Sequence, residues 1–164
     1  MLVGNGGSGK SWLSTRIAET TGLPLYHLDK EFWQPGWVMP PEEEQVARLQ
    51  QILSTDDWII DGDYGATMPM RFDAADLVIF LDINRALCLL SALRRTGKRR
   101  ADLPDYLTEP TVFSYGFWHF CSWIWRYPSV GRPKVLALHR QHPNTPFWRV
   151  TSRRQASALA HLNL

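Results

Sequence analysis

The segment Gly4-Asn5-Gly6-Gly7-Ser8-Gly9-Lys10-Ser11 decides how the rest of this sequence is interpreted. It matches the phosphate-binding pattern G-x-x-x-x-G-K-[ST], and it lies between an apolar strand stub and a stretch with helical spacing. Glycines let the backbone curl around a polyphosphate, while the following helix presents its positive end to the same anion. The sequence therefore predicts that a nucleotide is bound by Gly4, Asn5, Gly6, Gly7, Ser8, Gly9, Lys10 and Ser11.

Two side chains at the end of this segment have expected roles of their own. Lys10 is expected to reach the β and γ phosphates of ATP and to act in catalysis. Ser11 is expected to place its hydroxyl on Mg²⁺, the ion that neutralises charge developing during phosphoryl transfer. A flexible glycine-rich turn is the alternative, but it gives no reason for a Lys-Ser pair at a helix start. The motif predicts ATP and Mg²⁺ as cofactors.

Outward from this segment, apolar runs rich in branched residues alternate with helix-like patterns, without repeats or low-complexity linkers. The runs 58–60 and 77–81 are continuously apolar, as strands buried on both faces of a parallel sheet require. Together with 2–3, 25–28 and 147–150, they predict five strands. We expect one α/β domain over residues 1–164, a three-layer fold with a five-stranded parallel sheet and ligands at the carboxyl ends of the strands. Helices are expected near 11–20, 41–53, 85–93 and 113–127, and a closing helix is marked by Ala156, Leu159 and Leu162.

Composition narrows the class of protein. The chain has 164 residues, 45% of them hydrophobic and 21% charged, with a formal net charge of +2. It contains no apolar run of about 18 residues, so no membrane is expected as a partner, and no signal-peptide pattern precedes the glycine-rich segment. We expect a cytoplasmic protein. Cys88 and Cys121 lack Cys-x-x-Cys spacing, which argues against a zinc site, and both are expected to be buried thiols.

Carboxylates follow three of the predicted strands. Asp61 closes the run 58–60 and is expected to serve the metal by orienting a water on it. Asp29 follows the second strand, on the rim where a phosphoryl acceptor would bind, and is expected to hold an acceptor hydroxyl or the metal; a simple turn residue is the alternative. Asp82 is expected to cap the next helix. His27 is interpreted as a satisfied core or rim histidine.

The segment Arg94-Arg95-Thr96-Gly97-Lys98-Arg99-Arg100 carries five basic residues in seven. We interpret residues 94–110 as a mobile lid segment whose arginines swing over the nucleotide, with Arg95 and Arg99 expected in catalysis. A solvated basic face and a nucleic-acid patch are the alternatives. Arg71 is expected either to clamp an acceptor phosphate or to be an ordinary surface arginine.

Two further groups of residues are expected near the ligand. Aromatic residues crowd the stretch 117–127, mostly for core packing, with a wall for a planar acceptor or an interface with another copy as alternatives. Arg149, Arg153 and Arg154 flank the last predicted strand. Arg153 is expected to contact the nucleotide where its base leaves the phosphate loop, and the alternative is the charged end of a small helix.

Taken together, these residues resemble the adenylate-kinase-like DNA topology modulation proteins (FlaR-like). The resemblance spans nearly the whole chain and rests on the phosphate loop, His27-Leu28-Asp29-Lys30 with Phe32-Trp33 and Pro35-Gly36-Trp37, Trp58-Ile59-Ile60-Asp61-Gly62 with Tyr64-Gly65, the arginine segment, Arg132-Pro133 and Ser152-Arg153. It implies an adenylate-kinase-like P-loop NTPase fold with an acceptor-binding helical region and a lid. It also implies that Gly4 to Ser11 bind ATP, that Asp61 serves the metal and that Asp29 and Arg71 face the acceptor. Arg94, Arg95, Arg99 and Arg100 would belong to the lid.

Two features depart from that family. Only three residues precede Gly4, whereas a strand commonly has about 5 to 6, so either the true start lies upstream or the first strand is clipped. Trp12 places a bulky indole where many relatives carry a small or hydroxyl residue.

The sequence thus predicts a kinase-like phosphotransferase that passes the γ-phosphoryl group of Mg-ATP to a small acceptor, a nucleoside or a nucleotide. The alternative is a regulatory protein that binds ATP as a conformational ligand and affects DNA topology through nucleic-acid binding. A nucleotide hydrolase is a third class, but no residue that would orient an attacking water identifies itself. A small-molecule acceptor is the expected partner, and direct nucleic-acid contact is less favoured.

Overall fold

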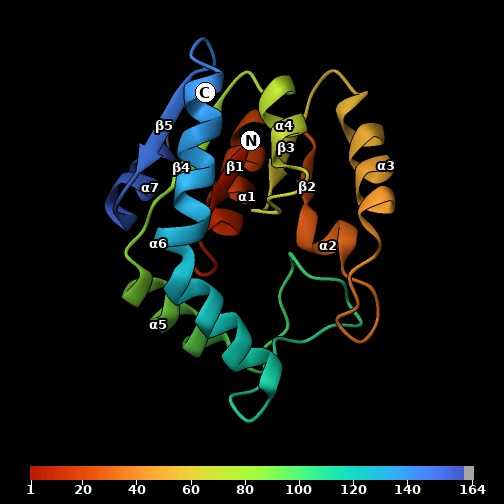
Figure 1. The fold of residues 1–164 in the computed structure, drawn as a ribbon, viewed down its shortest axis with the longest axis vertical. Helices are drawn as coiled ribbons and strands as arrows, with labels where there is room; N and C mark the ends of the chain where they lie inside the picture. Colours follow the sequence, from red (N-terminus) through yellow and green to blue (C-terminus); the bar gives the residue numbers. More distant parts are fainter. Residues whose placement is uncertain (161–164) are drawn as a thin grey trace.

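Five short parallel strands form the central sheet of the computed structural model, which describes residues 1–160. In chain order they are β1 (Leu2–Gly4), β2 (Leu25–His27), β3 (Ile59–Asp61), β4 (Val78–Leu81) and β5 (Phe147–Val150). Their order in the sheet is β2-β3-β1-β4-β5, so β1 lies in the middle between β3 and β4 (Figure 1). Because all pairs are parallel, the loops that follow the strands gather at one edge of the sheet.

Helices cover both faces of this sheet. The described helices are α1 (Lys10–Thr21), α2 (Leu28–Phe32), α3 (Glu42–Leu53), α4 (Met68–Ala74), α5 (Arg85–Arg95), α6 (Tyr115–Gln141) and α7 (Arg153–Leu159). One core packs α1 and α7 against the face that carries Leu2 and Ile79. A second core packs α4 and α6 against the face that carries Val3 and Phe80. Neighbouring strand residues thus serve opposite cores, which makes three layers.

The α/β class and the five parallel strands are confirmed, whereas α2 and α4 were not predicted, Leu28 begins α2 instead of ending a strand, and one helix boundary was wrong. The helix predicted near 113–127 begins at Tyr115 and continues to Gln141, through Pro128 and Pro133. Proline has no N–H, so Pro128 leaves the carbonyl of Ile124 without its helical donor. The side-chain amide of Asn5 fills that vacancy by donating to Ile124 O at 3.0 Å. A tertiary contact therefore satisfies a group that the helix itself leaves open.

Asp82 does not cap the helix that follows β4. The N-cap of α5 is Asn84, whose side chain accepts from the Ala86 N–H. Asp82 instead accepts from Arg132 Nε at 2.8 Å and from Arg149 Nε at 2.9 Å. These ion pairs tie α6 and β5 to the end of β4, and they hold Arg149 away from the site described below.

Three smaller expectations can be compared with the structure. Cys88 is buried and Cys121 is half-buried, and both are free thiols. The closing helix spans Arg153–Leu159, and Leu162 lies outside the described residues. No helix within residues 1–160 combines the length and the apolar character needed to cross a membrane.

Candidate functional site

The glycine-rich segment forms a tight loop between β1 and α1. Gly7 and Gly9 adopt positive φ angles of 75° and 97°, which side-chain-bearing residues rarely adopt. A Cβ at Gly7 would collide with the backbone carbonyl of Cys88, whereas the space beside Gly9 is open. No side chain caps the start of α1. The first N–H groups of this 12-residue helix are therefore available to an anion.

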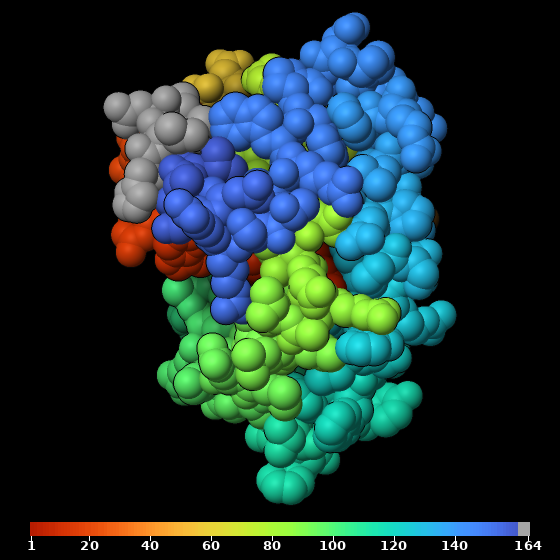
Figure 2. Space-filling view, turned by 90° about the vertical axis from the view of Figure 1, so that its left-hand side faces the viewer, coloured from red at the N-terminus to blue at the C-terminus, as the bar shows by residue number. Residues whose placement is uncertain are grey.

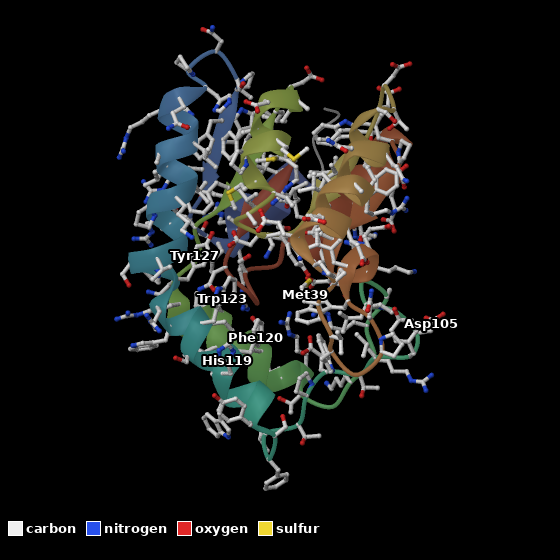
Figure 3. All side chains as sticks on the ribbon, turned by 45° about the vertical axis from the view of Figure 1, so that its right-hand side comes forward. Met39, Asp105, His119, Phe120, Trp123 and Tyr127 are labelled. Carbon is white, nitrogen blue, oxygen red and sulfur yellow. The ribbon has the colours of Figure 1, made fainter. Side chains whose placement is uncertain are left out.

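A cavity of about 610 Å³ opens over this loop at the carboxyl edge of the sheet. Its walls come from the loop, the starts of α1 and α2, the end of β3, α5, the lid segment, α6 and α7. Four cationic side chains line it: Lys10, Arg95, Arg100 and Arg153. Four carboxylates line it as well: Asp29, Asp61, Asp63 and Asp102. Phe120 and Trp123 add an apolar wall on the side of α6 that faces the cavity (Figure 3).

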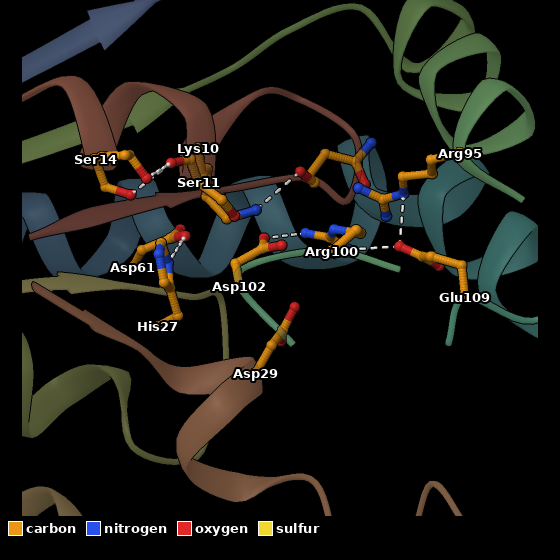
Figure 4. Close-up of polar contacts among 12 residues, drawn as sticks. Lys10, Ser11, Ser14, His27, Asp29, Asp61, Arg95, Arg100, Asp102 and Glu109 are labelled. Carbon is orange, nitrogen blue, oxygen red and sulfur yellow. Dashed lines mark hydrogen bonds and ion pairs between the residues drawn. The ribbon is translucent and has the colours of Figure 1, made fainter. Parts of the chain in front are cut away.

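Most residues that the sequence assigned to the nucleotide line this cavity. They are Gly6 to Ser11 and Arg153, whereas Gly4 and Asn5 lie beneath them. Lys10 Nζ donates to the carbonyl of Asn5 at 3.1 Å, so the ammonium group already lies inside the loop (Figure 4). Ser8 is buried, and its hydroxyl has no partner among the described residues.

The carboxylate at the end of β3 belongs to a group of potential metal ligands. Asp61 Oδ2 lies 3.0 Å from His27 Nδ1, and its buried Oδ1 has no partner within the described residues. Ligand atoms of His27, Asp61 and Asp102 all lie within 4.8 Å of one another. Burial opposes ionisation of Asp102, but Arg100 and the hydroxyl of Ser11 hold its pKa below the ordinary value. Sequence reasoning had found Asp61 and Ser11 but had assigned neither His27 nor Asp102 to this group.

The lid segment places its arginines on two different sides. Gly97 N donates to Glu109 O at 3.2 Å and Glu109 N donates to Lys98 O at 3.1 Å, which ties the two ends of the segment together. Arg100 lines the cavity, while Arg99 is exposed and lies outside it. Of the two arginines, Arg99 was expected in catalysis but does not line the cavity, whereas Arg100 does.

Both cavity-lining arginines of the lid are held by acids of the same segment. Arg95 Nε lies 2.9 Å from Glu109 Oε1, and Arg100 Nη1 donates to the same oxygen at 2.5 Å (Figure 4). Arg100 also donates to Asp102. Glu109 is only 6% exposed, which strengthens its attraction for both cations. An entering anion would compete with these carboxylates for the guanidinium groups.

Arg71 does not face an acceptor, contrary to expectation. Its side chain is fully buried and donates to the carbonyls of Gly62, Asp63 and Tyr64 at 2.7, 2.8 and 3.0 Å. Burial lowers its pKa to about 10. The guanidinium is thus used to shape the loop after β3, because three converging carbonyls match its fixed fork of donors.

Asp63 of that loop lines the cavity, and Tyr64 contacts a carboxylate that lines it. Asp63 accepts from Tyr127 Oη at 2.8 Å and from the Gly4 N–H at 3.3 Å. Tyr64 donates from its hydroxyl to Asp29 Oδ1 at 2.7 Å. Sequence reasoning missed Asp63, although it follows Asp61 by only two residues and lines the same cavity. Burial raises the pKa of both Asp29 and Asp63.

Asp29→Asn is expected to stabilise the protein relative to wild type as the pH rises above the ordinary pKa of an aspartate. The unfolded chain loses the Asp29 proton at the ordinary pKa, before the folded chain does, because burial raises the folded-state pKa. Wild-type stability therefore falls as the pH rises from the unfolded-state pKa of Asp29 to its folded-state pKa. Asparagine does not ionise, so the variant lacks this loss of stability, and its side-chain oxygen can still accept from Tyr64. Thermal unfolding between pH 4 and pH 8 measures the slope. Asp105→Asn, on an exposed part of the lid segment, is the control, and equal slopes for Asp29→Asn and wild type would contradict the expectation.

The far end of the cavity lies between α1 and α7. Trp12 is 48% exposed and lines the cavity together with Arg153, Ala156 and Ser157. Arg153 Nη2 donates to Leu87 O at 3.2 Å and to the hydroxyl of Ser91, which fixes its position beside α5. An indole face and a guanidinium plane are both suitable surfaces for stacking a flat ring.

Comparison of the chain with models of known protein families finds no match, and comparison with curated proteins finds no significant match.

Proposed function

We propose that this protein binds Mg-ATP and transfers its γ-phosphoryl group to a small acceptor. The observation that carries the proposal is a single cavity that contains the glycine loop with Lys10, two lid arginines and the strand-end carboxylates. A flexible turn would not require these groups to converge. The same proposal includes the finer fold, an adenylate-kinase-like P-loop fold, which is supported by a central β1 that leads directly into the phosphate loop.

The chemistry follows from the positions of these groups. Lys10 and the loop N–H groups hold the phosphates, while Arg95 and Arg100 exchange their carboxylate partners for the phosphoryl group and stabilise its charge. Asp29 accepts a hydrogen bond from the acceptor hydroxyl and then its proton. Burial raises the pKa of Asp29, which makes its carboxylate a stronger base than an exposed aspartate.

The residues present fit a divalent cation. Oxygen ligands suit Mg²⁺, and Asp61 Oδ1 is buried beside the cavity without a partner in the described part of the chain. Asp61 and Ser11 would hold the ion, with Asp102 close to Asp61. Bound Mg²⁺ supplies neutralisation of the charge on the transferring phosphate.

Transfer of labelled phosphate from ATP to a panel of small hydroxyl compounds tests the function. The panel includes nucleosides, nucleotides, sugars and amino alcohols, and the expected result is one labelled product class that requires Mg²⁺. Bound ATP without transfer to any compound would reject the kinase proposal.

Trp12→Ala is expected to weaken ATP binding about tenfold, because stacking of a base on an aromatic ring contributes about 1–3 kcal/mol. Binding of inorganic triphosphate, which has no base, is expected to stay unchanged. Calorimetry with both ligands measures the difference, and Trp12→Phe, which retains a ring, serves as the matched control. Equal losses for both ligands would mean that Trp12 acts on the phosphate loop instead of the base.

One observation supports the nucleic-acid alternative. After Glu109 the sequence contains seven lysines and arginines and no acidic residue. This part of the chain forms α6, β5 and α7, which lie beside α5 on one face of the molecule (Figure 2). Arg94, Lys98 and Arg99 are exposed outside the cavity. Binding of duplex DNA with a steep salt dependence, weakened by Lys98→Ala with Arg99→Ala, would support this function. An absence of DNA affinity at low salt would reject it.

A further inference from the structure

Three potential metal ligands meet at the carboxyl edge of the sheet, and they come from separate parts of the chain. His27 and Asp61 end β2 and β3 and are register partners across this strand pair. Asp102 belongs to the lid segment, and one ligand atom from each of the three side chains lies within 4.8 Å of the other two. Figure 4 shows Asp102 between Arg100 and the pair formed by His27 and Asp61. The group therefore joins the sheet to the lid.

The spacing within this group suits a single cation. His27 Nδ1 and Asp61 Oδ2 lie 3.0 Å apart. That distance is a hydrogen bond, and it is also the separation of two neighbouring ligands, about 3.0 Å, when each lies about 2.1 Å from one ion. Asp61 is only 4% exposed, and its buried Oδ1 has no partner among residues 1–160. A bound cation would satisfy this oxygen.

Positive charge already reaches the group from two arginines. Arg71 lies near Asp61 but donates to three backbone carbonyls. Arg100 donates to Asp102 and to Glu109. In the proposed function Arg100 exchanges these carboxylates for the phosphoryl group of the donor, and this exchange releases an oxygen of Asp102. The Ser11 hydroxyl lies beside Asp102 and stabilises its charge, so the released carboxylate stays next to the expected metal ligands.

Resting on the proposed function, we infer that one divalent cation is bound by His27, Asp61 and Asp102 together, so that the lid supplies one of its ligands. Mg²⁺ prefers oxygen ligands, whereas first-row transition ions also accept an imidazole nitrogen. His27 ligates through Nδ1 when the ring proton lies on Nε2. The site therefore takes Mn²⁺ in preference to Mg²⁺, and Arg100 competes with the ion for Asp102 until a phosphate binds Arg100.

Titration of the nucleotide-free protein with Mn²⁺ or Mg²⁺ tests the imidazole ligand. We expect a lower Kd for Mn²⁺, and pulsed electron paramagnetic resonance of the Mn²⁺ complex should detect coupling to an imidazole nitrogen. His27→Asn places an amide near the position of Nδ1. It should abolish this coupling and lower the Mn²⁺ affinity about tenfold, with a smaller change for Mg²⁺. A wild-type complex without nitrogen coupling overturns the inference, as does an equal loss of affinity for both ions.

The lid ligand is tested by removing its competitor. Arg100→Met frees Asp102 and is expected to raise the Mn²⁺ affinity roughly tenfold, because an ion pair no longer has to be broken. Arg99→Met is the matched control, since it removes an exposed charge of the same segment outside the cavity, and it should change the affinity little. Equal effects of the two variants would show that only general charge repulsion was relieved, which overturns the role of Asp102.

Asp102→Asn supplies the complementary measurement. It is expected to lower the Mn²⁺ affinity at least tenfold. Unchanged affinity in an Asp102→Asn protein that unfolds near the wild-type temperature overturns the inference. These titrations contain no nucleotide, so their failure leaves transfer from Mg-ATP intact, with Ser11 and Asp61 as the metal ligands. Binding of Mn²⁺ as expected, without phosphoryl transfer to any acceptor, would instead reject the kinase proposal and keep the metal site.

Discussion

Lys10→Met is expected to lower the rate of phosphoryl transfer by about 10²–10³-fold, the usual cost of removing one group that stabilises developing charge. The ammonium group lies inside the phosphate loop, where its described hydrogen bond is to the Asn5 carbonyl at 3.1 Å. Methionine fills similar space but carries no charge, so the triphosphate loses its main point contact while the loop backbone remains. Transfer rate and the rise in unfolding temperature with added ATP measure the two consequences.

The control for this change is Lys30→Met, which removes an exposed lysine from α2, outside the cavity. It should leave both the transfer rate and the stabilisation by ATP unchanged. Lys10→Met itself should unfold near the wild-type temperature when no nucleotide is present. Retained ATP stabilisation in Lys10→Met would contradict the assignment of the loop to a triphosphate.

Arg71→Met is expected to destabilise the fold by about 3 kcal/mol or more, because hydrogen bonds to charged groups contribute about 1.5–3 kcal/mol each. The variant leaves three carbonyls, those of Gly62, Asp63 and Tyr64, without their donor. It also withdraws positive charge from the neighbourhood of Asp63 and Asp61. Urea unfolding measures the loss, and the disturbed loop should reduce transfer in the fraction that folds.

Arg16→Met is the matched control, since Arg16 is an exposed arginine of α1 paired with Glu19 at 2.8 Å. A pair of this kind contributes only about 0.3–0.5 kcal/mol. An Arg71→Met protein as stable as Arg16→Met would show that water replaces the guanidinium, and the structural role assigned to Arg71 would then be wrong. Loss of transfer with full stability would instead revive the acceptor-clamp interpretation.

Local patterns sufficed for the layout of the fold. Continuous apolar runs predicted the buried strands around Ile60 and Phe80, because a strand covered on both faces has no polar side. The spacing from Gly4 to Ser11 predicted a loop before a helix, because positive φ angles and a helix start are properties of neighbouring residues. Asp29 and Asp61 were found in the same way, as acids at the ends of apolar runs; Asp61 is the last residue of β3 and Asp29 lies two residues beyond β2.

Properties that depend on distant partners were decided by the tertiary structure. Which of Arg99 and Arg100 lines the cavity depends on the conformation of the lid segment, in which residues 97–98 are hydrogen-bonded to the distant Glu109. The Ile124 carbonyl, which Pro128 leaves without a helical donor, accepts from the side chain of Asn5. Whether Arg71 is a surface cation or a buried one depends on where three carbonyls converge. The sequence by itself determined the order of elements and the phosphate-loop motif, because both are encoded over a few consecutive residues. The charge on each side of the cavity came only from the folded chain, because burial and ion pairing are set by residues far apart in sequence.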